Sequence, residues 1–350
     1  MTDSAVLDKK AVASASQYMG GVAWPTVILG LVVTASYLAT IAMALQGALS
    51  LWIAVPVVAV LTYASYTVAH DSIHGSISGN SKSLRWINKA LGYMAAWILM
   101  IPLTAHRHEH MAHHRHANDP EHDPDFPVSR MQDSVLAAAG AAMQITIGQF
   151  THYFKHRWSK APAKQNLVMC LEVAIAILPR LAILVSGYWI EGLALFVLAW
   201  LIGVVVLLYL FAYIVHRPHE QEGRYIDTST ILVPGSLGKL LTWLWLFQNY
   251  HSIHHLFPRV PFYHYARLYK EIEEIMAARG APVFRLTARG LRPVSTGLYA
   301  RSGQSESNSV VRRKTMQSLA GPLPKHTAIV GRELAHVREA PAGSDFHDFR

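Results

Sequence analysis

Residues 190–216 read IEGLALFVLAWLIGVVVLLYLFAYIVH, an apolar run with one charged side chain, Glu191, near its start and a histidine, His216, at its end. A helix of this length can cross a hydrocarbon core of ~30 Å. Its backbone hydrogen bonds are then satisfied internally, as a lipid environment requires. The run therefore predicts a transmembrane helix whose end carries a possible metal ligand.

Three more runs have the same character, at about 22–45, 48–69 and 167–187. With 190–215 they predict four transmembrane helices in two hairpins. Hydrophobic residues make up 52% of the chain and charged residues only 15%, against about 25% charged in soluble domains. The predicted class is an all-α integral membrane protein. We expect membrane lipids, and no nucleic acid, among its partners.

The third run is interrupted by Glu172 and by Arg180, which follows Pro179. Charged residues inside a membrane span usually face other helices or a functional path. The two lie eight residues apart on roughly the same side of a helix. We expect a structural polar contact between helices here.

Basic residues are unevenly distributed along the chain. They occur in 9–10, 82–89, 155–164 and 217–224, while the links near Gly47 and Tyr188 contain none. The positive-inside rule places the basic side in the cytoplasm. This predicts a multi-pass protein of a bacterial inner membrane. The apolar segment 90–105 is short and contains Pro102, so we expect it not to cross.

The ends of the chain differ from its middle. Residues 1–20 are predicted to be a cytoplasmic tail and residues 21–278 a membrane catalytic domain. Residues 279–350 are rich in Arg, Ser, Gly and Pro, a composition that predicts a mostly disordered basic tail.

Histidines cluster three times on the predicted cytoplasmic side. The clusters are 70–74 (HDSIH), 106–116 (HRHEHMAHHRH) and 251–255 (HSIHH). Residues three and four apart share one face of a helix. The HxxHH pattern of the second cluster recurs about 140 residues later in an otherwise apolar chain. The three clusters and the histidine at 216 can thus converge in a helical cap just outside the bilayer.

Such a set of imidazoles suits iron, copper, zinc or nickel. Eight or nine of them can hold two ions and leave positions for oxygen. Cys170 is the only cysteine, which excludes a disulfide or an iron–sulfur cluster formed within this chain, so electrons must come from another protein. Nearby acids, Asp71, Asp119, Glu121, Asp123 and Asp125, could orient the histidines. The acids at 119–125 equally suit turns.

The order HxxxH, HxxHH, HxxHH between apolar hairpins resembles the membrane fatty-acid desaturase superfamily. The strings HMAHHRHANDPEHDPD at 110–125, HRP at 216–218 and QNYHSIHHLFPRVPFY at 248–263 are similar to cyanobacterial-type β-carotene hydroxylases. DPDF at 123–126 is also similar to carotenoid ketolases.

This resemblance implies a non-heme di-iron site that uses dioxygen, with electrons from a carrier such as ferredoxin. It implies hydroxylation of the β-ring of a carotenoid, towards zeaxanthin, and a hydrophobic lipid or carotenoid substrate. The implied ligands are His70, His74, His110, His113, His114, His216, His251, His254 and His255. Asp71, Asn118, Asp119 and Asn249 are the candidates to support them.

Several alternatives stay open. An acyl-lipid desaturase and a carotenoid ketolase would have the same histidine spacing. Residues 106–110 also fit HxxEH, the inverted zinc-peptidase motif, although this leaves the first and third clusters unexplained. A histidine-rich metal transporter or sensor would need polar residues along its spans. Aromatic residues near the third cluster, such as Trp243 and Phe257, either line a substrate tunnel or belong to the interfacial belt.

Overall fold

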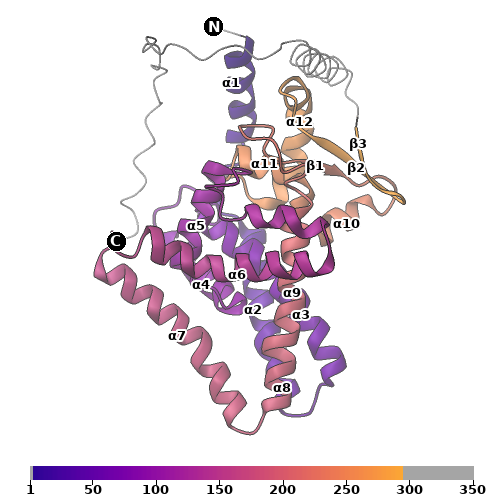
Figure 1. Ribbon diagram of the computed structural model, residues 1–350. Coiled ribbons are helices and arrows are strands. Elements are labelled where there is room, and N and C mark those ends of the chain that lie inside the picture. Colours follow the sequence, from indigo (N-terminus) through magenta and orange to yellow (C-terminus); the bar gives the residue numbers. More distant parts are fainter. Residues whose placement is uncertain (1–2, 295–350) are drawn as a thin grey trace, which may run out of the picture. The chain divides into compact units, whose positions relative to one another are not determined.

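The structure of the protein is a computed structural model that describes residues 3–294 (Figure 1). Four helices are long and apolar enough to cross a membrane: α2 (Trp24–Leu45), α3 (Leu51–Ile73), α7 (Ala163–Val185) and a composite helix, Trp189–Tyr213. The last consists of α8 (Trp189–Leu193), η2 (Ala194–Leu198), α9 (Ala199–Leu207) and η3 (Leu208–Tyr213), with η2 and η3 wound as π-helix. The predicted helical membrane class and its four spans are confirmed.

The spans present apolar side chains outward and pack closely inward. Leu178 and Val60 are more than half exposed, as expected for surfaces that face lipid. Ser50 caps α3 by accepting a hydrogen bond from the Trp52 backbone N–H at 3.3 Å. A methyl group added at Gly203 would lie 2.7 Å from the Ala59 carbonyl oxygen. Glycine therefore lets α9 lie directly against α3, as small residues do in membrane bundles.

A sharp bend follows α4 (Arg85–Leu99), because α5 (Leu103–His116) leaves at 93° to it. Met100 adopts a left-handed φ of 57° at the end of α4, and Pro102 cannot continue a helix. The indole N–H of Trp200 donates to the Leu99 carbonyl at 2.8 Å. The break predicted in segment 90–105 is therefore real, and its freed backbone carbonyl has a partner.

Glu172 and Arg180, the two charged residues inside the apolar part of α7, stabilise this bend. Arg180 donates to the Trp97 carbonyl at 2.8 Å, and its guanidinium lies 4.4 Å from the centre of the Trp97 ring. Glu172 accepts a hydrogen bond from the Thr104 backbone N–H at 2.9 Å, at the first turn of α5. The polar contacts expected between helices exist, with a separate partner for each residue.

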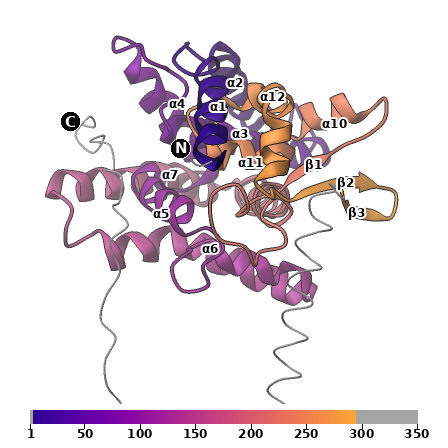
Figure 2. The same ribbon diagram turned by 90° about the horizontal axis from the view of Figure 1, so that it is seen from above.

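A helical cap covers one end of the spans. It contains η1 (Phe126–Gln132), α6 (Val135–His156), α10 (Gly238–Leu244), η4 (Gln248–Tyr250), α11 (His251–Leu256), η5 (Phe262–His264) and α12 (Tyr265–Ala278). Figure 1 shows α6 lying across the long helices, and Figure 2 shows α11 beside α12.

The first residues, predicted to be a cytoplasmic tail, are helical. They form α1 (Asp3–Ser16), which packs against α12 (Figure 2). Ala11 and Ala15 are fully buried in that contact. Arg279 lies 2.5 Å from the Asp8 carboxylate, which also accepts from the Tyr225 hydroxyl at 2.8 Å.

A small sheet was not predicted. Its order is β1 (Thr230–Leu232), β2 (Val283–Thr287), β3 (Gly290–Pro293), with β1 parallel to β2 and β2 antiparallel to β3. Gly290, with φ of 94°, allows the tight turn between β2 and β3. The ordered domain thus continues past the predicted boundary at 278, because residues 283–287 find partners far away in sequence. The rest of the predicted tail, 295–350, lies outside the described residues.

Candidate metal centre

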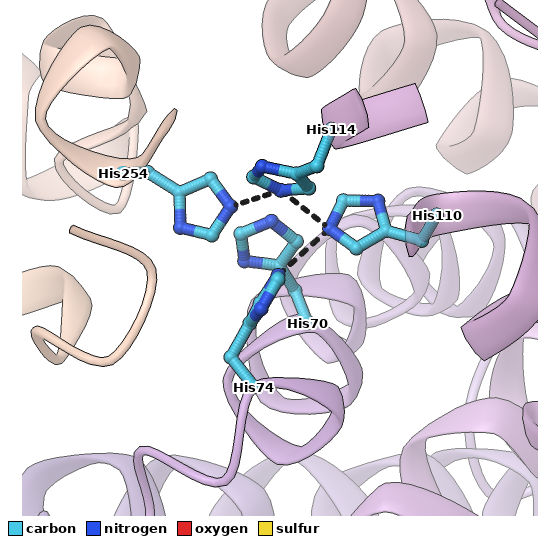
Figure 3. A group of neighbouring side chains, drawn as sticks. All are labelled: His70, His74, His110, His114 and His254. Carbon is cyan, nitrogen blue, oxygen red and sulfur yellow. Dashed lines mark hydrogen bonds between the residues drawn. The ribbon is translucent and has the colours of Figure 1, made fainter. Parts of the chain in front are cut away.

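Five imidazoles from three helices meet at the end of α3 (Figure 3). They are His70 and His74 from the end of α3, His110 and His114 from α5, and His254 from α11, and one ring nitrogen of each lies within 4.8 Å of all the others. The Nε2 atoms of His74 and His110 are 2.9 Å apart, and those of His114 and His254 are 2.8 Å apart. We name these residues the five-histidine group.

A second group lies beside the first. His113, His216 and His255 also offer ring nitrogens within 4.8 Å of one another, and we name them the three-histidine group. The rings of His255 and His114 are stacked with centres 4.3 Å apart, so the two groups adjoin. His251 belongs to neither group by that distance. Its ring centre is 4.9 Å from that of His255 and 5.3 Å from that of His216.

Hydrogen bonds to Nδ1 hold four of these rings in place. Acceptors are Asp123 for His113 at 2.9 Å, Asp227 for His255 at 3.2 Å, Gln248 for His251 at 3.2 Å, and the Tyr265 hydroxyl oxygen, 3.0 Å from His254. A proton fixed on Nδ1 leaves Nε2 as a lone-pair donor. This is the arrangement that supports metal-ligating histidines in proteins.

One member of the three-histidine group, His113, differs from its neighbours in its protonation. Burial, reinforced by neighbouring histidines, lowers the pKa of His74 to about 3 and keeps the pKa of His110 and His254 well below the usual range. Burial also acts on His113, but the carboxylates of Asp123, Asp125 and Asp227 outweigh it and raise its pKa to about 9. A metal ion bound by His113 would therefore displace a proton.

Several buried ring nitrogens lack a hydrogen-bond partner among residues 3–294. Both nitrogens of His70 do, as do Nδ1 of His110, Nδ1 of His216 and Nε2 of His255. A buried polar atom left unpaired costs about 1–3 kcal/mol. A bound metal ion would use such lone pairs, and an all-nitrogen donor set suits transition metals. The residues fit a metal centre.

An apolar cavity opens onto both groups. Its wall includes His110, His113, His216 and His251, and the space between the walls, open solvent included, is about 720 Å³. The rest of the wall is mainly apolar, with Leu99, Ile101, Ile145, Trp200, Val204, Leu207 and Phe211 among its members. A mostly apolar cavity with a few polar groups is typical of a site for a lipophilic molecule.

Comparison with known proteins identifies the family. A family model described as "Fatty acid desaturase" matches residues 46–287. The chain belongs to the fatty acid desaturase family. The superfamily predicted from the histidine spacing is thus confirmed.

The chain is similar to chloroplastic omega-3 desaturases and to a beta-carotene ketolase. A chloroplastic omega-3 fatty acid desaturase from Sesamum indicum is 25% identical over 58% of this chain and 50% of its own length. An "sn-2 acyl-lipid omega-3 desaturase (ferredoxin)" from Helianthus annuus is 23% identical over 58% and 51%. The chain spans about half the length of these plant enzymes. A beta-carotene ketolase from Paracoccus sp. (strain PC1) is 28% identical over 64% of this chain and 86% of its own length.

The nine histidines implied as ligands by the resemblance all lie at this centre, but the four polar residues proposed to support them make no hydrogen bond to their rings within the described part of the chain. Asp71 accepts from the Thr26 hydroxyl at 2.9 Å. Asn118 contacts a residue that supports His113, because its backbone N–H donates to Asp123 at 2.8 Å. Asp119 accepts from the backbone N–H of Glu121, and Asn249 donates to the Ile231 carbonyl at 2.9 Å.

The residues that hydrogen-bond the histidine rings at this centre are Asp123, Asp227, Gln248 and Tyr265. Asp123 was one of the nearby acids considered, whereas Asp227, Gln248 and Tyr265 were missed. Of the three missed residues, only Gln248 is close to its partner in sequence. It lies three residues before His251, about one helical turn away, and could have been found for that reason.

Besides His251, three further histidines of the clusters and one near His216 lie outside both groups. His106 lines the cavity, and His108 lies 2.7 Å from the Gln165 side-chain amide. His116 packs against His122, and His219 stacks on Tyr213.

Proposed function

We propose that this protein is a membrane oxygenase that uses two iron ions and dioxygen to hydroxylate the β-ring of carotenoids. The observation that carries the proposal is the meeting of nine imidazoles on an apolar cavity, eight of them in two adjoining groups and His251 beside them. The proposed ligands of one iron are the five-histidine group. Those of the other are the three-histidine group together with His251.

The iron pair would activate dioxygen for the oxidation of a C–H bond that acid–base chemistry cannot break. The chain's own residues do the rest. Asp123 and Asp227 hold His113 and His255 in position. The walls formed by Trp200 and Phe211 exclude water and orient an apolar ring against the histidines. Orientation decides which bond reacts.

A carotenoid substrate is supported by the Paracoccus beta-carotene ketolase, 86% of which aligns with this chain, against about half of the plant desaturases. The same likeness favours a second candidate function, oxidation of the ring to a ketone. The plant relatives favour a third, desaturation of acyl lipids.

A zinc peptidase receives less support. In the HxxEH reading, His106 and His110 would bind one zinc ion, but His110 lies in the five-histidine group while His106 is outside it.

We further propose an external electron donor such as ferredoxin, since one similar desaturase carries that donor in its name. The proposed location is a bacterial inner membrane with the cap on the cytoplasmic side, which is the side of the basic residues.

Expression in a bacterium that makes β-carotene tests the function, with pigments separated by chromatography. Zeaxanthin is the expected product. The variant His74→Ala should abolish it, while His122→Ala, at a histidine on the surface that pairs with Asp119, should not. Echinenone or canthaxanthin would instead identify a ketolase. Unchanged pigment with altered membrane unsaturation would identify a desaturase, and either result would overturn hydroxylation.

A further inference from the structure

His106 is a buried histidine in the cavity wall that the proposed metal centre does not use. Its side chain is 3% exposed, and its Nε2 atom has no hydrogen-bond partner within the described residues. Leaving a buried acceptor or donor unpaired costs about 1–3 kcal/mol. The atom therefore marks a place where a bound molecule can supply a missing partner.

Its neighbours determine which kind of partner. Nδ1 of His106 lies 2.6 Å from Oε1 of Gln149 and 3.4 Å from Oε2 of Glu109. Two oxygens facing Nδ1 place the ring proton on that atom. In a neutral imidazole the other nitrogen, Nε2, is then a hydrogen-bond acceptor.

The acceptor lies close to the metal centre. The ring centres of His106 and His110 are 5.6 Å apart, and both residues line the same cavity. Polar wall residues from α5 and α6, His106, Thr146 and Gln149, lie on this cavity together with an apolar wall from Leu99, Trp200 and Phe211. A ring held among them can therefore present an oxygen substituent to His106 while it lies beside the histidines of the metal centre.

We infer that His106 accepts a hydrogen bond from a hydroxyl group of the bound molecule, so that the cavity holds the hydroxylated β-ring formed by the proposed reaction more tightly than the unsubstituted ring. A ring ketone cannot replace the hydroxyl, because it has no hydrogen to donate. This inference rests on the proposed carotenoid function and adds a product-binding residue to it.

The test measures pigment retention by the purified protein in lipid nanodiscs. Discs receive equal amounts of β-carotene and zeaxanthin, and empty discs give the background partitioning. One hydrogen bond corresponds to a preference of about 2- to 10-fold. We expect the wild type to retain zeaxanthin over β-carotene by that factor. His106→Phe should reduce the ratio to near one, while His106→Gln, which keeps an acceptor oxygen, should restore part of it.

His108→Phe is the matched control. It makes the same change two residues away, at a histidine bonded to Gln165 and absent from the cavity wall, so the preference should persist. A second test changes the pigment and uses the wild-type protein. Zeaxanthin dimethyl ether keeps the oxygens but has no hydroxyl hydrogen, and wild type should retain it no better than β-carotene.

Equal retention of zeaxanthin, its ether and β-carotene by wild type would overturn the role of His106 and leave the carotenoid function standing. The same follows if His106→Phe folds with its full metal content and keeps the preference. Failure of the proposed function has a different signature, because no carotenoid would then be retained above the empty discs and none converted in cells.

Discussion

At the scale of single residues, the two histidine groups are held by different parts of the chain. The five-histidine group is fixed by α3, α5 and α11. The three-histidine group depends on carboxylates from loops, Asp123 before α6 and Asp227 after the fourth span. Because each carboxylate accepts from Nδ1, it fixes the ring that must present Nε2 to a metal. The three-histidine group is therefore the more sensitive to changes outside the helices.

Replacing these carboxylates should weaken one metal site selectively. Asp123→Asn and Asp227→Asn keep the side-chain size but lose the charge, so we expect metal affinity at the three-histidine group to fall about 10- to 100-fold. Bound iron, measured by elemental analysis after dialysis against a chelator, should drop towards one ion per chain. Asp119→Asn is the control, since Asp119 pairs with the surface residue His122. Retention of two irons by both variants would contradict this role.

The residue scale also shows what a sequence can reveal about such a site. The nine histidines could be found because helical spacing puts residues three and four apart on one face. Asp71 was a wrong candidate for the same geometric reason. Consecutive helix residues point about 100° apart, so Asp71 does not lie on the face of His70 and accepts instead from Thr26 of α2. Asp227 could not be found, because only the fold brings it to His255, 28 residues away.

At the scale of elements, the bend between α4 and α5 positions the second histidine cluster. The last carbonyls of α4 and the first N–H groups of α5 have no helical partners of their own. Arg180 satisfies the Trp97 carbonyl, and Glu172 accepts from Thr104. Two charged residues within one span thus fix the direction of α5, and with it His110, His113 and His114.

Loss of the Arg180 guanidinium should loosen this bend. Arg180→Leu removes the charged hydrogen bond to the Trp97 carbonyl, which keeps only the 3.3 Å bond from the Met100 backbone N–H, so we expect the free energy of unfolding to fall by about 1–3 kcal/mol. Thermal unfolding in detergent should begin several degrees lower, together with reduced iron binding. Arg180→Lys should recover only part, because an ammonium group lacks the planar stacking on Trp97.

Leu181→Ala tests whether any change in this part of α7 has the same effect. Leu181 is 47% exposed on the outer side of the helix, so its truncation should shift unfolding very little. An equal loss in Leu181→Ala and Arg180→Leu would mean that the bend does not depend on the guanidinium.

The elements themselves were predictable to different degrees. The four spans and the break at Pro102 follow from local composition, because lipid allows few alternatives to a helix. The sheet was missed because β1 and β2 are about 50 residues apart and each is short. Helix α1 was missed as part of the core because its buried face consists of Ala11 and Ala15, which give a weak apolar pattern.

At the scale of the whole molecule, one requirement follows from the site. The three clusters lie at the ends of different helices, and they can adjoin only if those ends are on the same side of the membrane. The links after α2 and after α7 must then lie on the opposite side. The uneven distribution of basic residues predicts that the side with the clusters is the cytoplasm.

Cysteine labelling can test this sidedness directly, because Cys170 is the only cysteine and Cys170→Ser gives a clean background. Gln46→Cys and Ser186→Cys lie at exposed positions in the two links, while Arg115→Cys and Lys270→Cys are exposed in the cap. A membrane-impermeant maleimide should label the first pair in intact cells and the second pair only after permeabilisation. If the cap positions were labelled in intact cells and the link positions only after permeabilisation, the predicted orientation would be wrong and the shared metal centre would still stand. Labelling of the Arg115 and Lys270 positions from opposite sides would separate α5 from α12 and rule out a shared metal centre.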